Sequence, residues 1–221
     1  MRQIFTVSQF EFPYADLKFP GQATDEQILY VTREAPVMLH LRLFTVGLVS
    51  LVLATTGSLV PFLMPSFSPG YTFGLIVGSF VLGIATLGIG SWWMTKLWKK
   101  SIFILTNRRL TKFIYTTPWN RYDLSLGLDK IVDTGAYARG YFQAVFGIGT
   151  FSARSSAGNR ADKYFYIENV HRSEDLKHYI SKLLHHYNHN ENDLKNFRPF
   201  IPWLKGEARK RFLKNYPQYW S

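Results

Sequence analysis

The side chains best suited to bind another molecule are cations that gather near position 110. Arg108, Arg109 and Lys112 follow a short apolar run that has a strand-like composition. Guanidinium and ammonium groups bind phosphate and carboxylate oxygens, so anionic lipid headgroups would suit this cluster. Two interpretations stay open here: general attraction to an anionic surface, and a specific headgroup pocket.

A second set of cations lies among aromatic residues near the C-terminal end. From Lys195 to Lys214 the sequence has seven Lys and Arg residues and one Glu. This mixture is typical of a segment that lies in a membrane interface, with aromatic anchors and cations near anionic lipid. Nucleic acid is disfavoured as a partner, although it attracts any basic surface. The candidate lipid or partner contacts are Lys205, Arg209, Lys210, Arg211 and Lys214.

No set of residues converges on a catalytic centre. His185 and His189 have a helical spacing that could hold a metal ion, yet only Glu191 is near enough in sequence to complete the site. A solvated helix end is the favoured interpretation. The Gly147–Gly149 run lacks the Lys-Ser/Thr of a phosphate-binding loop, and the chain has no cysteine. We therefore expect no enzyme, no cofactor and no metal site.

One segment departs sharply from the mean hydropathy of −0.08. The 53 residues between Arg42 and Lys96 include no Asp, Glu, Lys, Arg or His. A soluble core helix carries charge on its outer face, so a run this long belongs in lipid. Leu43–Met64 and Tyr71–Met94 are each long enough to span a bilayer, and Pro65–Gly70 forms a short connection. The sequence predicts a transmembrane helical hairpin.

Flanking residues predict the orientation of this hairpin. The connection has no cation, whereas Lys and Arg residues flank both outer ends, so both termini are expected on the cytoplasmic side. Trp92, Trp93 and Trp98 would form an interfacial belt there. The small residues Gly74, Gly78 and Gly83 let helices approach closely. They would pack either on the first span or on another membrane protein.

After Lys100 the sequence changes to short β-branched and aromatic runs separated by Asn, Gly and Pro. A helix is expected to begin at Ser173, because Glu174 and Asp175 favour a first turn. The fold class is thus an α+β membrane protein. Its expected parts are a cytoplasmic N-terminal segment (1–42), the hairpin (43–94), a sheet-and-helix domain (95–187) and a basic aromatic tail (188–221), with a helix only around Leu204–Asn215.

Several short motifs in this order resemble the bacterial pleckstrin-homology-like (PH-like) family of small membrane proteins. They are PGQATDEQILY (Pro20–Tyr30), TNRRL (Thr106–Leu110), Leu128–Ile131, FGIGTFSAR (Phe146–Arg154) and Asn169-Val170. The resemblance covers Pro20 to His186. It implies a bent antiparallel barrel capped by a C-terminal helix, with Ser101–Thr106 as the first strand and no catalytic residues. It also implies headgroup contacts near the first hairpin. The insertion of Gln22, Ala23 and Thr24 and the long tail depart from the pattern.

Two functions are expected from these features. The first is a membrane-anchored PH-like scaffold that binds a protein or anionic lipid at the cytoplasmic surface. The second is an accessory or assembly subunit of a larger integral membrane complex, for example an energy-converting or photosynthetic one. The lipid bilayer is a partner in both cases, and an integral membrane protein is the expected second partner.

Overall fold

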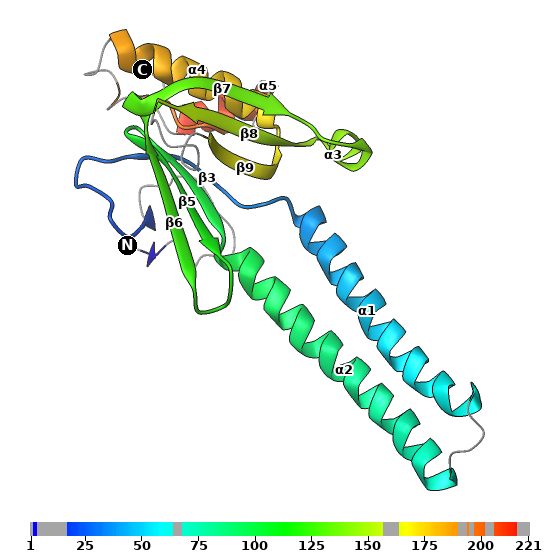
Figure 1. Ribbon diagram of the computed structural model, residues 1–221. Helices are drawn as coiled ribbons and strands as arrows, with labels where there is room; N and C mark the ends of the chain where they lie inside the picture. The colour runs from blue at the N-terminus through cyan, green and yellow to red at the C-terminus, as the bar shows by residue number, and fades with distance from the viewer. Residues whose placement is uncertain are drawn as a thin grey trace. The chain divides into compact units, whose positions relative to one another are not determined.

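A computed structural model describes residues 2–3, 17–63, 68–156, 164–189, 194, 197–201 and 206–215 (Figure 1). The chain divides into two compact units. The hairpin unit comprises Pro36–Trp98 and Thr116–Asn120; the sheet unit comprises Met1–Ala35, Lys99–Tyr115 and Arg121–Ser221. The architecture is α+β, with two long apolar helices and antiparallel sheets, as the sequence predicts.

The two long helices are α1 (Pro36–Leu63) and α2 (Pro69–Lys100). Helix α2 contains the predicted span Tyr71–Met94 and extends beyond both of its ends, and α1 begins before the predicted span Leu43–Met64 and covers it to Leu63; Met64 lies outside the described residues. Each helix begins with Pro, whose fixed φ and missing N–H suit the first helical position. At 1.5 Å per residue they are about 42 and 48 Å long, enough to cross a hydrocarbon core of about 30 Å. Only 6% and 11% of their most apolar windows are buried, so neither is the core helix of a globular domain.

Small and hydroxylated residues join α1 to α2 in an antiparallel pair. A Cβ added at Gly83 would lie 3.0 Å from Cβ of Ala54 and 3.1 Å from the carbonyl oxygen of Ser50. The Ser50 hydroxyl donates a hydrogen bond to the Gly83 carbonyl, and Ser58 and Ser79 hydroxyls lie 3.1 Å apart. Polar groups satisfied inside the pair leave the outer surface apolar, which suits a lipid environment.

A four-stranded antiparallel sheet has the order β3-β4-β5-β6. Its strands are β3 (Ile28–Thr32), β4 (Ile102–Thr106), β5 (Arg109–Tyr115) and β6 (Arg121–Gly127). The expectation that Ser101–Thr106 forms the first strand is wrong, because β3 precedes the helices and pairs with β4, Thr32 opposite Phe103. The helical hairpin is therefore an insertion between two neighbouring strands. A sheet domain of residues 95–187 alone would lack β3.

A second antiparallel sheet has the order β7-β8-β9. The 3-10 helix η3 (Leu128–Lys130) leads into β7 (Ile131–Tyr137), α3 (Tyr141–Val145), β8 (Ile148–Ser155), β9 (Tyr164–His171) and α4 (Ser173–His189). Helix α4 lies along this sheet in Figure 1. It begins at Ser173, as predicted, and its residues Leu176, Ile180 and Leu183 are fully buried in one core with residues of both sheets.

Both faces of the four-stranded sheet are covered, which explains why the first four residues of β3 and of β4 are all buried. On β4, Phe103 and Leu105 face the main core, while Ile102 and Ile104 belong to a second apolar cluster. Residues Leu17 and Phe19 complete this second cluster from the N-terminal side. Leu17 lies in the short strand β2 (Leu17–Lys18), which pairs in parallel with β1 (Arg2–Gln3).

The beginning of the expected tail belongs to the core. The Phe200 amide donates to the carbonyl of Leu29 in β3, at 2.9 Å. The Phe200 ring packs against Tyr30 and Tyr179, with centroids 4.9 and 5.0 Å apart. This contact covers the outer edge of β3. An uncovered edge strand exposes unpaired backbone groups that can pair with a strand of another chain. The boundary expected at residue 187 is therefore too early. Helix α5 (Gly206–Asn215) lies within the range predicted for it.

Candidate functional site

The predicted basic cluster lies at the turn between β4 and β5 and on β5 itself. Arg108 is in the turn, Arg109 begins β5, and Lys112 lies three residues further along that strand. Each of these cations contacts other parts of the protein, and the contacts differ from one to the next. The structure thus brings Arg108 and Arg109 together but directs Lys112 elsewhere.

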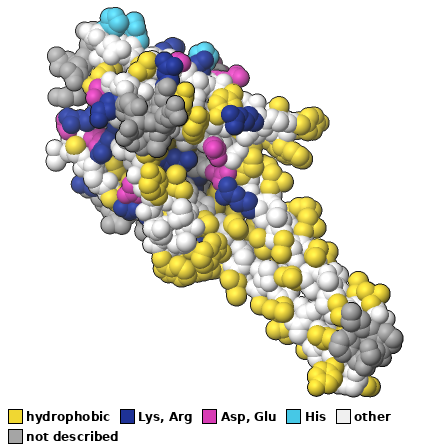
Figure 2. Space-filling model, in the orientation of Figure 1, with side chains coloured by type: hydrophobic (Ala, Val, Ile, Leu, Met, Phe, Trp, Pro, Cys, Tyr) yellow, Lys and Arg dark blue, Asp and Glu magenta, His cyan; other side chains and the backbone are white. Residues whose placement is uncertain are grey.

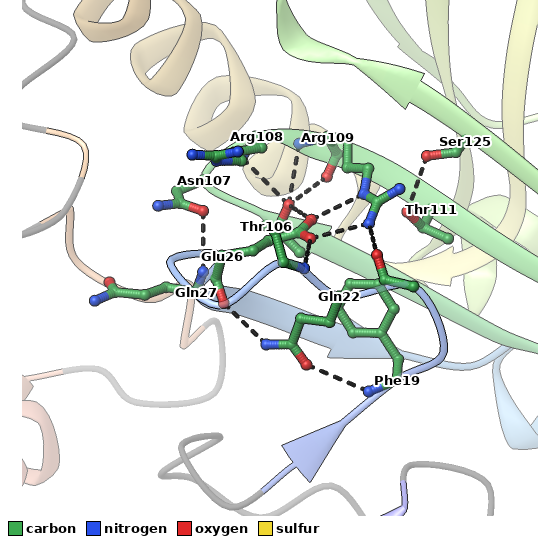
Figure 3. A network of polar contacts seen from close by, with 12 residues as sticks. Phe19, Gln22, Glu26, Gln27, Thr106, Asn107, Arg108, Arg109, Thr111 and Ser125 are labelled. Atoms are coloured by element: carbon green, nitrogen blue, oxygen red, sulfur yellow. Dashed lines mark hydrogen bonds and ion pairs between the residues drawn. The ribbon is translucent and has the colours of Figure 1, made fainter.

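Arg109 forms the centre of a buried network with Glu26 (Figure 3). Its Nε and Nη2 atoms donate to the two carboxylate oxygens of Glu26 at 2.9 and 3.0 Å, a bidentate ion pair. The Thr106 hydroxyl and the Ala23 amide donate to the same carboxylate at 2.7 and 3.1 Å. Arg109 also donates to the Gly21 carbonyl. Because the Glu26 side chain is only 1% exposed, this carboxylate is satisfied entirely by protein groups.

The electrostatics of the network favour the charged forms of both partners. Burial by itself would raise the pKa of the Glu26 carboxyl, but hydrogen bonds from Arg109, Thr106 and Ala23 and the charge of Arg109 lower it overall. The hydrogen bond to Glu26 raises the pKa of Arg109, and partial burial opposes this. Both groups are therefore ionised at neutral pH, and the charge of Arg109 is neutralised inside the protein.

A parallel set of contacts surrounds Arg108. Its guanidinium pairs with Asp25, both side chains being about half exposed. Next to it, the amides of Asn107 and Gln27 hold the two segments together: Asn107 N donates to Gln27 O at 3.1 Å, and Gln27 N donates to Asn107 Oδ1 at 3.0 Å. We call the contacts of residues 19–27 with residues 106–109 the turn latch. The adjacent acids 25 and 26 pair with the adjacent arginines 108 and 109.

Lys112 connects the two sheets. Its ammonium group donates to the Tyr166 carbonyl of β9 at 3.0 Å. Burial lowers the pKa of Lys112, and the nearby carboxylates of Glu168 and Glu34 oppose this shift. The group therefore stabilises the packing of β5 against β9 and is already hydrogen bonded to protein.

The turn latch explains two of the sequence motifs. In PGQATDEQILY the acids and Gly21 supply acceptors. In TNRRL the Thr and Arg side chains supply donors, and the Asn side chain supplies an acceptor. Sequence reasoning quoted Glu26 without assigning it a role. The sequence does contain a signal for this contact: two adjacent acids, Asp25 and Glu26, lie in one motif, and two adjacent arginines, Arg108 and Arg109, lie in the other.

The hairpin glycines divide into two groups. Gly83 packs tightly on α1, whereas nothing lies within 4 Å of a Cβ built at Gly74 or Gly78. The predicted packing residues therefore lie on two faces of α2. The face with Gly83 packs on α1, and the face with Gly74 and Gly78 is open in the described structure. In Figure 2, hydrophobic and uncharged side chains cover most of the visible face of the hairpin.

The predicted aromatic belt lies in the second half of α2. Trp92 is 48% exposed, and Trp93 packs edge-on against Trp119 in the connection between β5 and β6, with centroids 5.6 Å apart. Trp98 is partly buried. An exposed and a protein-anchored Trp next to each other at one end of an apolar helix fit a membrane–water boundary.

The basic tail is described in part. Lys210, Arg211 and Lys214 are exposed on α5, where Lys210 also pairs with Glu207 at 2.9 Å. Lys205 and the side chain of Arg209 lie outside the described residues. Among the residues that the structure describes, no group of three or more His, Asp, Glu or Cys side chains could hold a metal ion.

Asn169, like Glu26, lies in one of the sequence motifs, and the sequence alone assigned it no role. It has a left-handed backbone, φ 57°, which Asn tolerates better than most residues. Its carbonyl accepts from the Ala35 amide at 2.8 Å, its Nδ2 donates to Glu34 at 2.7 Å, and its Oδ1 accepts from Gln143 at 2.9 Å. Asn169 thus joins β9, α3 and the segment just before α1.

Comparisons with known proteins add little to this description. A scan of protein-family models gives no match to the chain, and a search of curated proteins gives none either. Among solved structures, a DUF1696 family protein with a pleckstrin-homology domain from Shewanella loihica PV-4 is similar, with 18% identity and a TM-score of 0.29. The match covers 40% of this chain and 70% of that chain.

Proposed function

We propose that the chain is a non-enzymatic, membrane-anchored scaffold protein. Its helical hairpin crosses the bilayer with both ends on the cytoplasmic side. Its two antiparallel sheets and α4 form a PH-like module that binds a protein partner or anionic lipid headgroups at that surface.

One observation carries the proposal: two long, exposed, apolar helices are inserted between the paired strands β3 and β4. The connections are short, because only Arg33–Ala35 separate β3 from α1 and only Ser101 separates α2 from β4. Both helix ends are thus covalently linked to neighbouring strands of one sheet. Exposed apolar surface of this extent needs hydrocarbon around it.

Membrane extraction tests the anchoring. We expect the full chain to stay in the membrane pellet through an alkaline carbonate wash and to enter solution only with detergent. Recovery of the chain in the aqueous fraction would contradict the proposal. A peripheral protein of similar charge, which carbonate releases, is the appropriate control.

For lipid recognition the exposed cations of α5 are better candidates than the turn cations, because Arg109 and Lys112 are already bound to protein groups. Lys210, Arg211 and Lys214 lie within about one helical turn. In nanodiscs, anionic lipid should slow amide hydrogen exchange in α5 relative to zwitterionic lipid. Charge reversal of these three residues should abolish the difference in exchange between the two lipids. If the difference persists in the reversed variant, these three residues are not the lipid contacts.

A second candidate function is an accessory subunit of a larger membrane complex. The open face of Gly74 and Gly78 supports it, since such a face lets another helix approach closely. Purification in mild detergent followed by mass spectrometry should then recover stoichiometric partners, and Gly78→Val should lose them. Recovery of wild type alone as a monomer would exclude this candidate.

A further inference from the structure

Helix α3 presents a compact group of exposed apolar side chains at the tip of the β7–β8 hairpin (Figure 1). Tyr141, Phe142, Val145 and Phe146 are 79%, 62%, 59% and 46% exposed. Figure 2 shows hydrophobic side chains gathered at this tip. Nothing in the described part of the protein covers them, although apolar surface of this kind is normally covered by a partner.

The backbone holds this group in a defined geometry. Gly140 and Gly147, at the two ends of α3, have φ of 85° and 60°, values that favour glycine. Within the turn, Ala144 N donates to Gly140 O and Phe146 N donates to Phe142 O, at 3.3 and 3.1 Å. The aromatic side chains are therefore carried by an ordered helical turn.

Hydrogen bonds place α3 beside the residues that lead into α1. Gln143 of α3 donates to Asn169, and Asn169 in turn donates to Glu34 and accepts from the Ala35 amide. Ala35 directly precedes Pro36, the first residue of α1. Within the sheet unit, α3 is thus linked by hydrogen bonds to Glu34 and Ala35, the last residues of that unit before α1.

The charge around α3 distinguishes the kinds of partner. From Thr134 to Ala161 the sequence has three Arg residues and no Asp or Glu. Of these, Arg139 is exposed and directly precedes Gly140, whereas Arg154 lies at the far end of β8, opposite Asp133. Aromatic rings with a cation beside them suit the boundary between headgroups and acyl chains, where rings are half immersed and cations contact phosphate.

We propose that α3 inserts its apolar side chains into the interfacial layer of the membrane that the hairpin crosses, forming a second contact between the sheet unit and the bilayer. This rests on the proposed function, because it needs the hairpin to cross that membrane. The side chains would reach about 5–10 Å into the headgroup–acyl boundary. Such a contact would fix the tilt of the sheet unit on the surface.

The chain has no cysteine, so single cysteines can be labelled cleanly in the full-length protein. We would reconstitute three variants in vesicles that contain nitroxide-labelled lipid, each with an environment-sensitive fluorophore: Val145→Cys, Val132→Cys and Leu82→Cys. Val132 is the matched control, because it is 58% exposed and lies at the other end of β7 from α3. Leu82 is 62% exposed near the middle of α2 and reports on the hairpin.

We expect nitroxides near the headgroup to quench position 145 strongly and position 132 weakly. Nitroxides near the chain ends should quench position 82. Iodide in the buffer should quench position 132 but not 145. If 145 is quenched by lipid no more than 132 while 82 is quenched, the inference is wrong and the anchoring stands. If 145 is shielded from both lipid and iodide, a second copy covers α3 and lipid does not. If 82 is not quenched, the anchoring fails and the inference fails with it.

Discussion

At the scale of single residues, the turn latch shows that adjacent cations can have different uses. Arg109 is bound by a buried carboxylate, while Arg108 pairs with Asp25 at the surface. The buried pair has its remaining oxygen sites filled by Thr106 and Ala23, the condition under which a buried carboxylate is tolerated. Its role is to hold the N-terminal segment on the β4–β5 turn.

Glu26→Gln should therefore destabilise the sheet unit, whereas its neighbour Asp25→Asn should not. The amide cannot accept all the donors that now point at Glu26, and one unsatisfied buried group costs about 1–3 kcal/mol. For the exposed pair, the change should stay within about 0.5 kcal/mol. Amide hydrogen exchange of β4 and β5 in the detergent-solubilised chain measures the loss of stability in each variant. Equal effects of the two variants would show that the latch does not stabilise the sheet.

The pH dependence of the latch follows from the lowered pKa of Glu26. Because the folded pKa lies below the unfolded one, the carboxylate stabilises the fold fully above the unfolded value and loses this contribution as pH falls through the folded value. The difference in thermal midpoint between wild type and Glu26→Gln should thus be constant from neutral pH to about pH 5 and narrow below it. A difference that widens on acidification would contradict the assignment.

The cations themselves could be found from the sequence, but their partners could not. The residues that bind Arg108 and Arg109 lie more than 80 positions earlier, on the other side of the hairpin. The composition near position 110 indicates a positively charged surface. Only the fold shows that Asp25 and Glu26 neutralise the charges of Arg108 and Arg109. The same holds for Phe200, which local composition assigns to a tail and which packs in the core.

At the scale of elements, the glycines of α2 separate packing within the hairpin from packing outside it. Gly83→Val should weaken the hairpin, because the new Cβ meets Ala54 and the Ser50 carbonyl at 3.0 and 3.1 Å. Overpacking of this kind costs about 1–3 kcal/mol. Gly78→Val meets nothing within 4 Å and should leave the isolated protein unchanged. Thermal unfolding in detergent micelles compares the two, and a lower midpoint for Gly78→Val than for Gly83→Val would contradict this assignment of faces.

Local patterns predicted most elements correctly for a physical reason. A charge-free run, a short run of β-branched and aromatic residues, and a helix start with acids in its first turn each arise within one element, as in α1, β4 and α4. The position of β3 in the sheet depends on pairing across the inserted helices, from Ile28–Thr32 to Phe103–Thr106. Such pairing leaves no mark in a short window of sequence. The motif resemblance implied that Ser101–Thr106 is the first strand, which is wrong, because β3 precedes it in the chain and pairs with it.

At the scale of the whole molecule, the central claim is that the hairpin crosses a membrane and returns. The insertion between paired strands requires both helix ends to connect to one sheet, so the connection near Ser68 should be on the opposite side of the bilayer. The described residues Ser68 and Asn120 are both exposed, the first just before α2 and the second between β5 and β6. They provide matched positions for labelling.

The most direct test is the accessibility of single cysteines at these two positions in sealed right-side-out membrane vesicles. With Ser68→Cys, a membrane-impermeant maleimide should react before permeabilisation; with Asn120→Cys, it should react only after permeabilisation, and inside-out vesicles should reverse the pattern. If both cysteines react from the same side of the membrane, the hairpin does not cross it and the account is wrong.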